Sequence, residues 1–180
     1  MKDRIWTASN LLSMFRVVLI VPVAWCITHE SPVNNYLAFV LSIAAGFTDL
    51  FDGMLARYLN QVTELGKVID PLADKLCVII VVGILSLQGK IPLWFIAIAV
   101  ARDIVILTGG IYVKRIKGII LMSNTAGKWA VAFIGFLVLV AELNMPQAEG
   151  LKNIFIGIST LLLAVSSTQY ATRFWETVKN

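Results

Sequence analysis

The sequence contains little charge, little sulfur and a single imidazole. Of its 180 residues, 14% are charged and 58% are hydrophobic, and the mean hydropathy is +0.83, whereas soluble domains average about 25% charged residues. One soluble core cannot hide this much apolar surface, so the composition predicts a membrane protein. The two cysteines, Cys26 and Cys77, exclude a disulfide scaffold. Together with the lone His29 they also exclude a zinc or copper site, so that any bound metal would be held by oxygen.

The excess of positive charge is small and is not gathered in one place. The formal net charge is +4, and no run of Lys and Arg alternates with aromatic residues as on a nucleic-acid-binding surface. We therefore expect no nucleic-acid partner. Anionic lipid headgroups are the expected partner of these cations.

Long apolar stretches dominate the sequence, and each is long enough to cross a bilayer, which takes about 20 residues. We predict an all-α fold, a single membrane domain over residues 1–180 that forms a bundle of six transmembrane helices. A short interfacial segment, Met1–Ser9, is expected to precede them, because it carries Trp6 among charged residues. The spans are predicted at 11–28, 34–56, 67–88, 91–113, 125–143 and 152–170.

The positions of the Lys and Arg residues predict the orientation, since cytoplasmic ends of spans collect positive charge. With the N-terminus inside, only Lys90 and Lys152 lie on the outer face. We therefore expect both termini in the cytoplasm. Few cysteines and no targeting segment favour a bacterial inner membrane as the location, with an organelle membrane as the alternative. Leu11–Ile27 also has features of a secretory signal, but five further spans would anchor the chain without it. The cations of the inner face are Lys2, Arg4, Arg57, Lys67, Lys114, Arg115, Lys117, Lys128, Arg173 and Lys179.

Two carboxylates lie at the cytoplasmic end of the second predicted span. Asp49 and Asp52 are three residues apart, and Gly53 and Ala56 continue the same helical face. Small residues on this face let a bulky ligand approach the backbone, and Arg57 adds a planar donor suited to phosphate. The pattern is typical of a phosphate-binding face.

Two more carboxylates, Asp70 and Asp74, are four residues apart at the start of the third span. Pro71 leaves two alternatives: Asp70 caps a helix that begins with proline, or the helix starts near Gly66 and bends at Pro71. The short connection between the spans predicts antiparallel neighbours, with all four carboxylates at one depth near the cytoplasmic surface.

Four carboxylates this close would repel one another unless positive charge were supplied. Oxygen ligands favour Mg²⁺ or Mn²⁺, and two such ions can hold a phosphoryl group during its transfer. The alternative interpretation of two intramembrane Asp pairs is a cation or proton pathway.

The spacing of these residues resembles the signature of the CDP-alcohol phosphotransferase family. The matching pattern is Asp49-x-x-Asp52-Gly53-x-x-Ala56-Arg57, then Gly66-x-x-x-Asp70-x-x-x-Asp74. The resemblance implies a homodimer that uses Mg²⁺ or Mn²⁺ and displaces CMP from a CDP-alcohol, here CDP-diacylglycerol, by an acceptor hydroxyl.

The resemblance also implies a role for each matching residue. Asp49, Asp52, Asp70 and Asp74 would hold two metal ions, and Asp74 would also take the proton of the acceptor hydroxyl. Gly53, Arg57 and Thr63 would contact the CDP moiety.

The acceptor alcohol is predicted less directly. The segment Asn10–Arg16 is similar to the opening of phosphatidylglycerophosphate synthases, which favours glycerol 3-phosphate, with Arg102 and Lys128 as candidate ligands of its phosphate. Those enzymes typically carry a further Arg where this chain has Gly110, and Gly-Lys-x-Lys-Thr where it has Gly127-Lys128-Trp129-Ala130. Phosphatidylglycerol, as in a cardiolipin synthase, or an inositol phosphate stays open as the acceptor.

Other residues carry weaker expectations. An arginine inside a span is costly, so we expect Arg102 to have a partner beyond its neighbour Asp103. Glu142 and Glu149 are expected to be solvated on the outer side. Trp6, Trp25, Trp94, Trp129 and Trp175 are expected near span ends, and Gly109, Gly110 and Gly127 at close helix contacts. An ion carrier and a catalytically silent scaffold are the alternative functions.

Overall fold

The computed structural model describes residues 8–58, 66–118 and 124–179. Side chains are described for residue 15 and for residues 17–48, 76–118 and 124–179. These parts of the chain form α-helices and one 3₁₀ helix and contain no strand, which confirms the all-α prediction. The helices are α1 (Ala8–Thr28), α2 (Pro32–Tyr58), α3 (Gly66–Leu87), α4 (Leu93–Lys117), α5 (Thr125–Leu143), the 3₁₀ helix η1 (Pro146–Ala148) and α6 (Glu149–Lys179).

The helices begin and end where the local sequence favours it. Pro32 opens α2, where its fixed φ suits the first turn and its missing N–H is not needed. Gly118 ends α4 with a φ of 68°, and its N–H donates to the Lys114 carbonyl oxygen at 3.0 Å. Asn124 caps α5, since its Oδ1 accepts from the Gly127 N–H at 2.8 Å.

Three of the predicted spans are confirmed as long apolar helices. In the described part of the chain, Leu93–Lys117, Thr125–Leu143 and Pro146–Lys179 are long and apolar enough to cross a bilayer. The first three predicted spans fall on α1, α2 and α3. The described apolar stretches of α1 and α3 are shorter, Val17–Thr28 and Leu76–Leu87. The number of six spans therefore stays a prediction.

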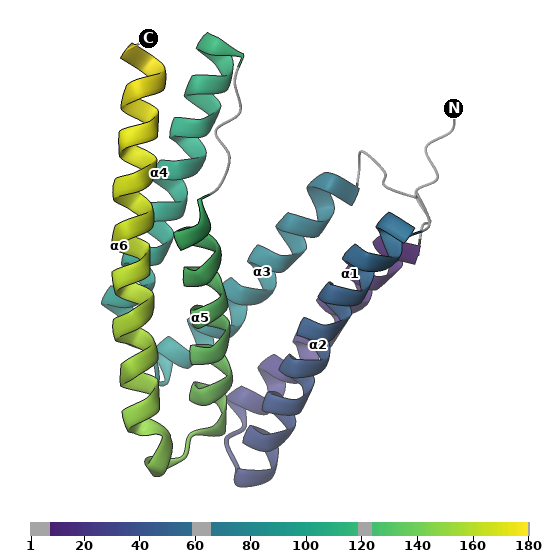
Figure 1. The fold of residues 1–180 in the computed structure, drawn as a ribbon. Coiled ribbons are helices and arrows are strands. Elements are labelled where there is room, and N and C mark those ends of the chain that lie inside the picture. Colours follow the sequence, from purple (N-terminus) through teal and green to yellow (C-terminus); the bar gives the residue numbers. More distant parts are fainter. Residues whose placement is uncertain (1–7, 59–65, 119–123, 180) are drawn as a thin grey trace. The chain divides into compact units, whose positions relative to one another are not determined.

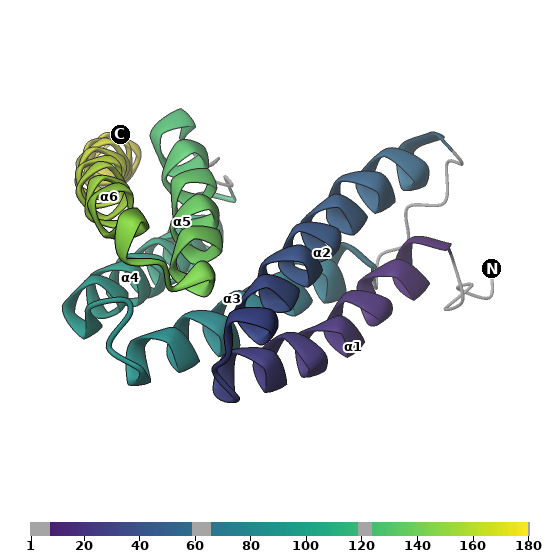
Figure 2. The ribbon, with the colours of Figure 1, turned by 90° about the horizontal axis from the view of Figure 1, so that it is seen from below.

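The helices fall into two compact units. Unit 1 comprises Met1–Lys90 together with Ala141–Asn144, the last turn of α5 and the residue after it. Unit 2 comprises Ile91–Val140 and Met145–Asn180. In unit 1, α1 packs against both α2 and α3, and Figures 1 and 2 both show α1 lying beside α2. In unit 2, α4 packs against α6.

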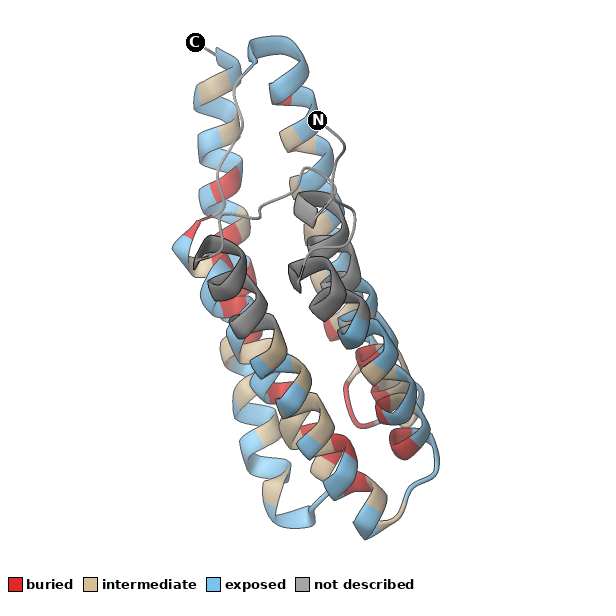
Figure 3. Ribbon diagram, turned by 90° about the vertical axis from the view of Figure 1, so that its right-hand side faces the viewer, coloured by how far each residue is buried: buried red, intermediate tan, exposed pale blue. Residues whose placement is uncertain are grey.

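Each unit has a narrow buried core and a wide apolar exterior. The core of unit 1 contains Val23 and Ile27 of α1, Ala38 of α2 and Leu85 of α3, each at most 1% exposed. Elsewhere exposed positions run along every described helix (Figure 3). Many of them are large and apolar, which suits contact with lipid chains and supports an integral membrane protein.

The described tryptophans all lie on this exterior. Trp25, Trp94, Trp129 and Trp175 are 55%, 52%, 58% and 71% exposed. Trp25 and Trp94 lie within a turn of a helix end, where an interfacial belt would place them. Trp6 and most of the predicted segment Met1–Ser9 lie outside the described residues.

Candidate functional site

The four aspartates of the sequence pattern lie on two helices of unit 1. Asp49 and Asp52 are in α2, and Asp70 and Asp74 are in α3. Their side chains lie outside the described residues. The positions of the four residues on their helices follow from the helical backbone and from the burial of the neighbouring described turns.

The described turns of α2 show which of its faces is turned to the protein interior. Asn35 and Ala38 are buried, and Ser42 and Ala45 are half-buried, whereas Tyr36, Leu37, Val40 and Phe47 are exposed. The inward positions are spaced 3, 4 and 3 residues apart, which is one face of a helix. Continuing this spacing by 4 and 3 residues gives Asp49 and Asp52.

The described turns of α3 give the same result. Val81 and Leu85 are buried and Cys77 is half-buried, whereas Leu76, Ile79 and Ile80 are exposed. Counting back from Cys77 by 3 and then 4 residues gives Asp74 and Asp70, so both aspartates occupy positions on the inward face of α3.

The two aspartate pairs also lie near the same end of unit 1. Figure 1 shows that α2 ends and α3 begins at that end. At 1.5 Å rise per residue, Asp49 and Asp52 lie about 9–14 Å before the end of α2, and Asp70 and Asp74 about 6–12 Å after the start of α3. Among the described residues, the packing that joins α2 and α3 runs through α1, so direct contact between these two helices stays a prediction.

The start of α3 decides between the two alternatives for Pro71. Because α3 begins at Gly66 and continues through Pro71, Asp70 lies inside the helix and is not its cap. Asp70 and Asp74 are therefore stacked one helical turn apart.

The residues predicted to contact CDP fall partly within α2. Gly53 and Arg57 lie in its last two turns, and their side-chain surroundings are not described. Thr63 lies outside the described residues.

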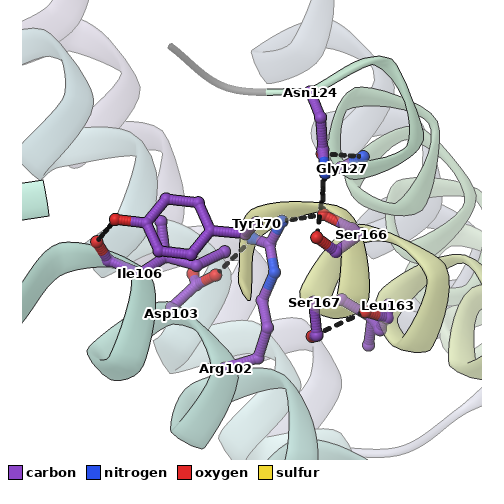
Figure 4. A network of polar contacts seen from close by, with 9 residues as sticks. All are labelled: Arg102, Asp103, Ile106, Asn124, Gly127, Leu163, Ser166, Ser167 and Tyr170. Carbon is purple, nitrogen blue, oxygen red and sulfur yellow. Dashed lines mark hydrogen bonds and ion pairs between the residues drawn. The ribbon is translucent and has the colours of Figure 1, made fainter. Parts of the chain in front are cut away.

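Unit 2 contains a buried polar network around Arg102 of α4 (Figure 4). Arg102 Nη1 donates to Asp103 Oδ1 at 2.8 Å, and Nη2 donates to the Ser166 hydroxyl of α6. The expected further partner of Arg102, in addition to Asp103, is thus the Ser166 hydroxyl of α6, the helix against which α4 packs. Arg102 Nε is buried and has no hydrogen-bond partner among the described residues.

Asn124 extends this network to the start of α5. Its Nδ2 donates to the Ser166 carbonyl oxygen at 2.9 Å, and its Oδ1 accepts from the Ser166 hydroxyl at 2.7 Å. The sequence analysis missed Asn124 and Ser166. An Asn directly before a predicted span is a typical helix cap and could have pointed to the first of them.

The glycine expectations can be checked against Tyr170 and this network. A Cβ on Gly110 would lie 3.4 Å from the Tyr170 hydroxyl oxygen, an ordinary contact, whereas the other two positions are tighter. A Cβ atom on Gly127 would lie 2.7 Å from Arg102 Nη2 and 2.9 Å from Ser166 Oγ. A Cβ on Gly109 would lie 3.2 Å from the hydroxyl oxygen of Tyr170, which donates to the Ile106 carbonyl at 2.8 Å. Both glycines therefore lie at close contacts between helices, as predicted. Lys128, the second predicted phosphate ligand, is exposed and lies outside this network.

The expectation of a solvated Glu142 is wrong. Glu142 is 1% exposed, and its Oε1 accepts a hydrogen bond of 2.7 Å from the Ser42 hydroxyl. Glu149 is exposed as predicted and pairs with Lys152 at 2.7 Å. The position in the sequence places Glu142 and Glu149 near the same membrane surface. It does not show that Glu142 alone is bound by Ser42.

Comparison with known proteins gives a family match and several relatives. The sequence profile described as CDP-alcohol phosphatidyltransferase matches residues 6–166. The chain is 30% identical to the CDP-diacylglycerol–glycerol-3-phosphate 3-phosphatidyltransferase of Bacillus subtilis, over 94% of this chain and 91% of that protein. It is 31% identical to the protein of the same name from Aquifex aeolicus, over 91% and 93%. A putative cardiolipin synthase of Mycobacterium tuberculosis is 30% identical over 83% of this chain and 70% of its own length.

Proposed function

The chain belongs to the CDP-alcohol phosphatidyltransferase family, and from this membership we propose that it transfers a phosphatidyl group from CDP-diacylglycerol to glycerol 3-phosphate. The products are phosphatidylglycerophosphate and CMP. The observation that carries the proposal is the register of α2 and α3, because the described inward face of each helix continues onto an aspartate pair at the same end of unit 1.

Four aspartates on the inward faces of α2 and α3 would suit a divalent metal centre. Asp49, Asp52, Asp70 and Asp74 would hold Mg²⁺ or Mn²⁺, since carboxylate oxygens are the ligands that these ions prefer. Two bound ions would neutralise the charge of the diphosphate and of the departing CMP. Bound metal ions would also balance the negative charge of the four carboxylates, which would then need no Lys or Arg as a partner.

Asp74 is the proposed general base of the reaction. Its carboxylate takes the proton of the acceptor hydroxyl, whose oxygen then forms a bond to the phosphorus that carries the diacylglycerol. The bond from this phosphorus to the bridging oxygen of the diphosphate breaks, and CMP leaves with that oxygen. Gly53 and Arg57 of α2 and Thr63 would bind the CDP moiety: glycine admits it close to the helix, and the arginine fork pairs with phosphate.

Arg102 and Lys128 are the proposed ligands of the acceptor phosphate. The Nη atoms of Arg102 are engaged by Asp103 and Ser166, so the unpartnered Nε is the donor left for a phosphate oxygen. Lys128, one helical turn after the Asn124 cap, adds an exposed ammonium group.

The membrane arrangement completes the proposal. We place both termini and the aspartates on the cytoplasmic side, because the Lys and Arg residues are concentrated at that end of the predicted spans. The acyl chains of the donor would then lie in lipid and the cytidine in water. A homodimer and a bacterial inner membrane are part of the same proposal.

Phosphatidylglycerol is the second candidate acceptor. This chain has Gly110 and Ala130 where phosphatidylglycerophosphate synthases typically have a cation. The relative from Mycobacterium tuberculosis is named as a putative cardiolipin synthase. An acceptor with a single phosphodiester needs fewer cations than a free phosphate monoester does.

The test is CMP release by the purified protein with CDP-diacylglycerol and Mg²⁺, assayed separately with glycerol 3-phosphate, phosphatidylglycerol, inositol, inositol phosphate and serine. Release that requires glycerol 3-phosphate is expected. Release only with phosphatidylglycerol would replace the acceptor, and no release with any of them would contradict the proposed function.

A further inference from the structure

A second group of polar side chains, two of them buried, lies in unit 1 between the aspartates and the end where α1 ends and α2 begins (Figure 1). Glu142 is 1% exposed and Lys90 is 8% exposed. Lys90 Nζ lies 2.9 Å from Glu30 Oε1, and its charge also attracts the Glu142 carboxylate. Ser42 Oγ donates to Glu142 Oε1 at 2.7 Å. The group joins three chain segments that are far apart in sequence.

Burying the Glu142 carboxylate is energetically unfavourable, so its presence here indicates a specific role. Removing an ionised carboxylate from water is unfavourable unless its oxygens find partners. Glu142 Oε2 is buried and has no hydrogen-bond partner among the described residues. A leucine would fill the same space without that cost, so packing alone does not account for a glutamate here.

Ser42 connects Glu142 to the face of α2 that carries the aspartates. Asp49 and Asp52 follow Ser42 by 7 and 10 residues, so the three positions share one helical face. Along the helix axis, Asp49 lies about 10 Å and Asp52 about 15 Å from Ser42. Because α2 runs unbroken from Pro32 to Tyr58, a rotation of the helix at Ser42 also turns the positions of Asp49 and Asp52.

The fully buried positions of α2 beside Ser42 carry short side chains. They are Asn35 and Ala38, whereas the larger Phe39, Leu41 and Ile43 are only half-buried. A short alanine side chain interlocks less with a neighbouring helix than leucine or phenylalanine does. The hydrogen bond from Ser42 to Glu142 is directional and therefore adds to the packing that fixes the rotation of α2.

We infer that Glu142 is a positioning residue for the transfer reaction, which sets the rotation of α2 through Ser42 and thereby the placement of the Asp49–Asp52 face. The inference rests on the proposed function for its effect on catalysis. It assigns Glu142 no contact with substrate or metal. The group around Glu142 thus acts on the reaction through one helix.

The first test compares variants of the pair by the Mg²⁺ dependence of CMP release. Ser42→Ala and Glu142→Leu should lower kcat and raise the half-saturating Mg²⁺ concentration, each about tenfold, since small misplacements of reacting groups cost one to two orders of magnitude. Glu142→Gln keeps an oxygen that accepts from Ser42 and should stay within about threefold of wild type. Glu149→Gln is the matched control, because this glutamate at the start of α6 is exposed and its carboxylate pairs with Lys152.

The second test measures the rotation of α2 without any activity. Cysteine is introduced in place of exposed Ala44 or half-buried Ala45, in a variant whose native Cys26 and Cys77 are replaced by alanine. The rate of alkylation by a small methanethiosulfonate in detergent is then compared at the two positions. Ser42→Ala should raise the ratio of the rate at 45 to the rate at 44 at least about threefold, whereas Glu149→Gln should leave it unchanged.

Wild-type values of both the Mg²⁺ requirement and the alkylation ratio in Ser42→Ala would overturn the inference. If Glu142→Leu fails to fold, the Ser42→Ala result decides, because this change removes only one hydroxyl group. Wild-type protein that releases no CMP with any acceptor would contradict the proposed function, and the alkylation ratio would still test the role of Glu142 in setting α2.

Discussion

Asn124 and Ser166 exchange two hydrogen bonds across unit 2. The Ser166 hydroxyl donates to Asn124 Oδ1 at 2.7 Å, and Asn124 Nδ2 donates to the Ser166 carbonyl oxygen at 2.9 Å. Both side chains are buried. The pair therefore holds the first turn of α5 against the middle of α6 and leaves few polar atoms of this region without a partner.

Replacing Asn124 by alanine should destabilise the protein. Asn124→Ala removes the cap of α5 and leaves the Ser166 hydroxyl and carbonyl without these partners, at an expected cost of about 2–3 kcal/mol. The midpoint of thermal unfolding in detergent, followed by far-ultraviolet circular dichroism, measures the effect. Asn124→Asp keeps the capping oxygen and should recover part of the loss. An unchanged midpoint for Asn124→Ala would contradict the described network.

Alanine at Gly127 should be much worse than alanine elsewhere in α5. Gly127→Ala places a methyl group within 2.9 Å of Arg102 and Ser166, which forces the network apart and should lower stability by about 1–3 kcal/mol. Gly135 is in the same helix, and a Cβ there meets nothing within 4 Å. Gly135→Ala should therefore raise stability by about 0.5–1 kcal/mol through helix propensity. Equal effects of the two changes on the unfolding midpoint would contradict the close contact at Gly127.

Asp74→Asn should abolish catalysis and leave the fold intact. Loss of the proposed general base is expected to lower the rate of CMP release by about 10²–10⁴-fold. Gel filtration and circular dichroism of the same sample show whether the protein is folded. Glu176→Gln, a change of an exposed carboxylate on α6, is the control and should keep the wild-type rate. Normal turnover by folded Asp74→Asn protein would rule out Asp74 as the base.

Arg102→Lys should weaken binding of the acceptor without affecting the donor. A lysine keeps the charge but has no planar fork, so it cannot reach Asp103, Ser166 and a phosphate together. We expect the KM for glycerol 3-phosphate to rise about tenfold, which corresponds to about 1.4 kcal/mol, with the KM for CDP-diacylglycerol unchanged. Ser166→Ala should lower thermal stability but leave both KM values close to wild type. A KM for glycerol 3-phosphate that does not change would assign Arg102 a structural role only.

The sequence predicts the helices well and gives the spacing of the aspartates within α2 and within α3, because both follow from local periodicity. The spacings of three and four residues between Asp49 and Asp52 and between Asp70 and Asp74 place each pair on one face of whatever helix contains it. The described burial of Ala38 and Val81 adds which face that is. Which face is turned inward depends on tertiary packing. The sequence does not show it, since apolar residues lie on all sides of these helices.

The partners of the buried polar residues could not be predicted. Ser42 and Glu142 are 100 positions apart, and no local pattern indicates that one faces the other. Arg102 shows a related difficulty. Adjacent residues on a helix point in different directions, which argued against Asp103 as a sufficient partner, yet a long arginine side chain can bend to reach its neighbour and Ser166 at once.

The exposure of the tryptophans determines which optical signals this protein can give. Trp25, Trp94, Trp129 and Trp175 are all more than half exposed, so their fluorescence reports the surrounding lipid or detergent more than the protein core. Emission intensity is for this reason a poor measure of unfolding. In bilayers that contain brominated lipids, however, quenching would vary with the depth of each indole ring. Four single-tryptophan variants would then measure how the helix ends are placed in the membrane.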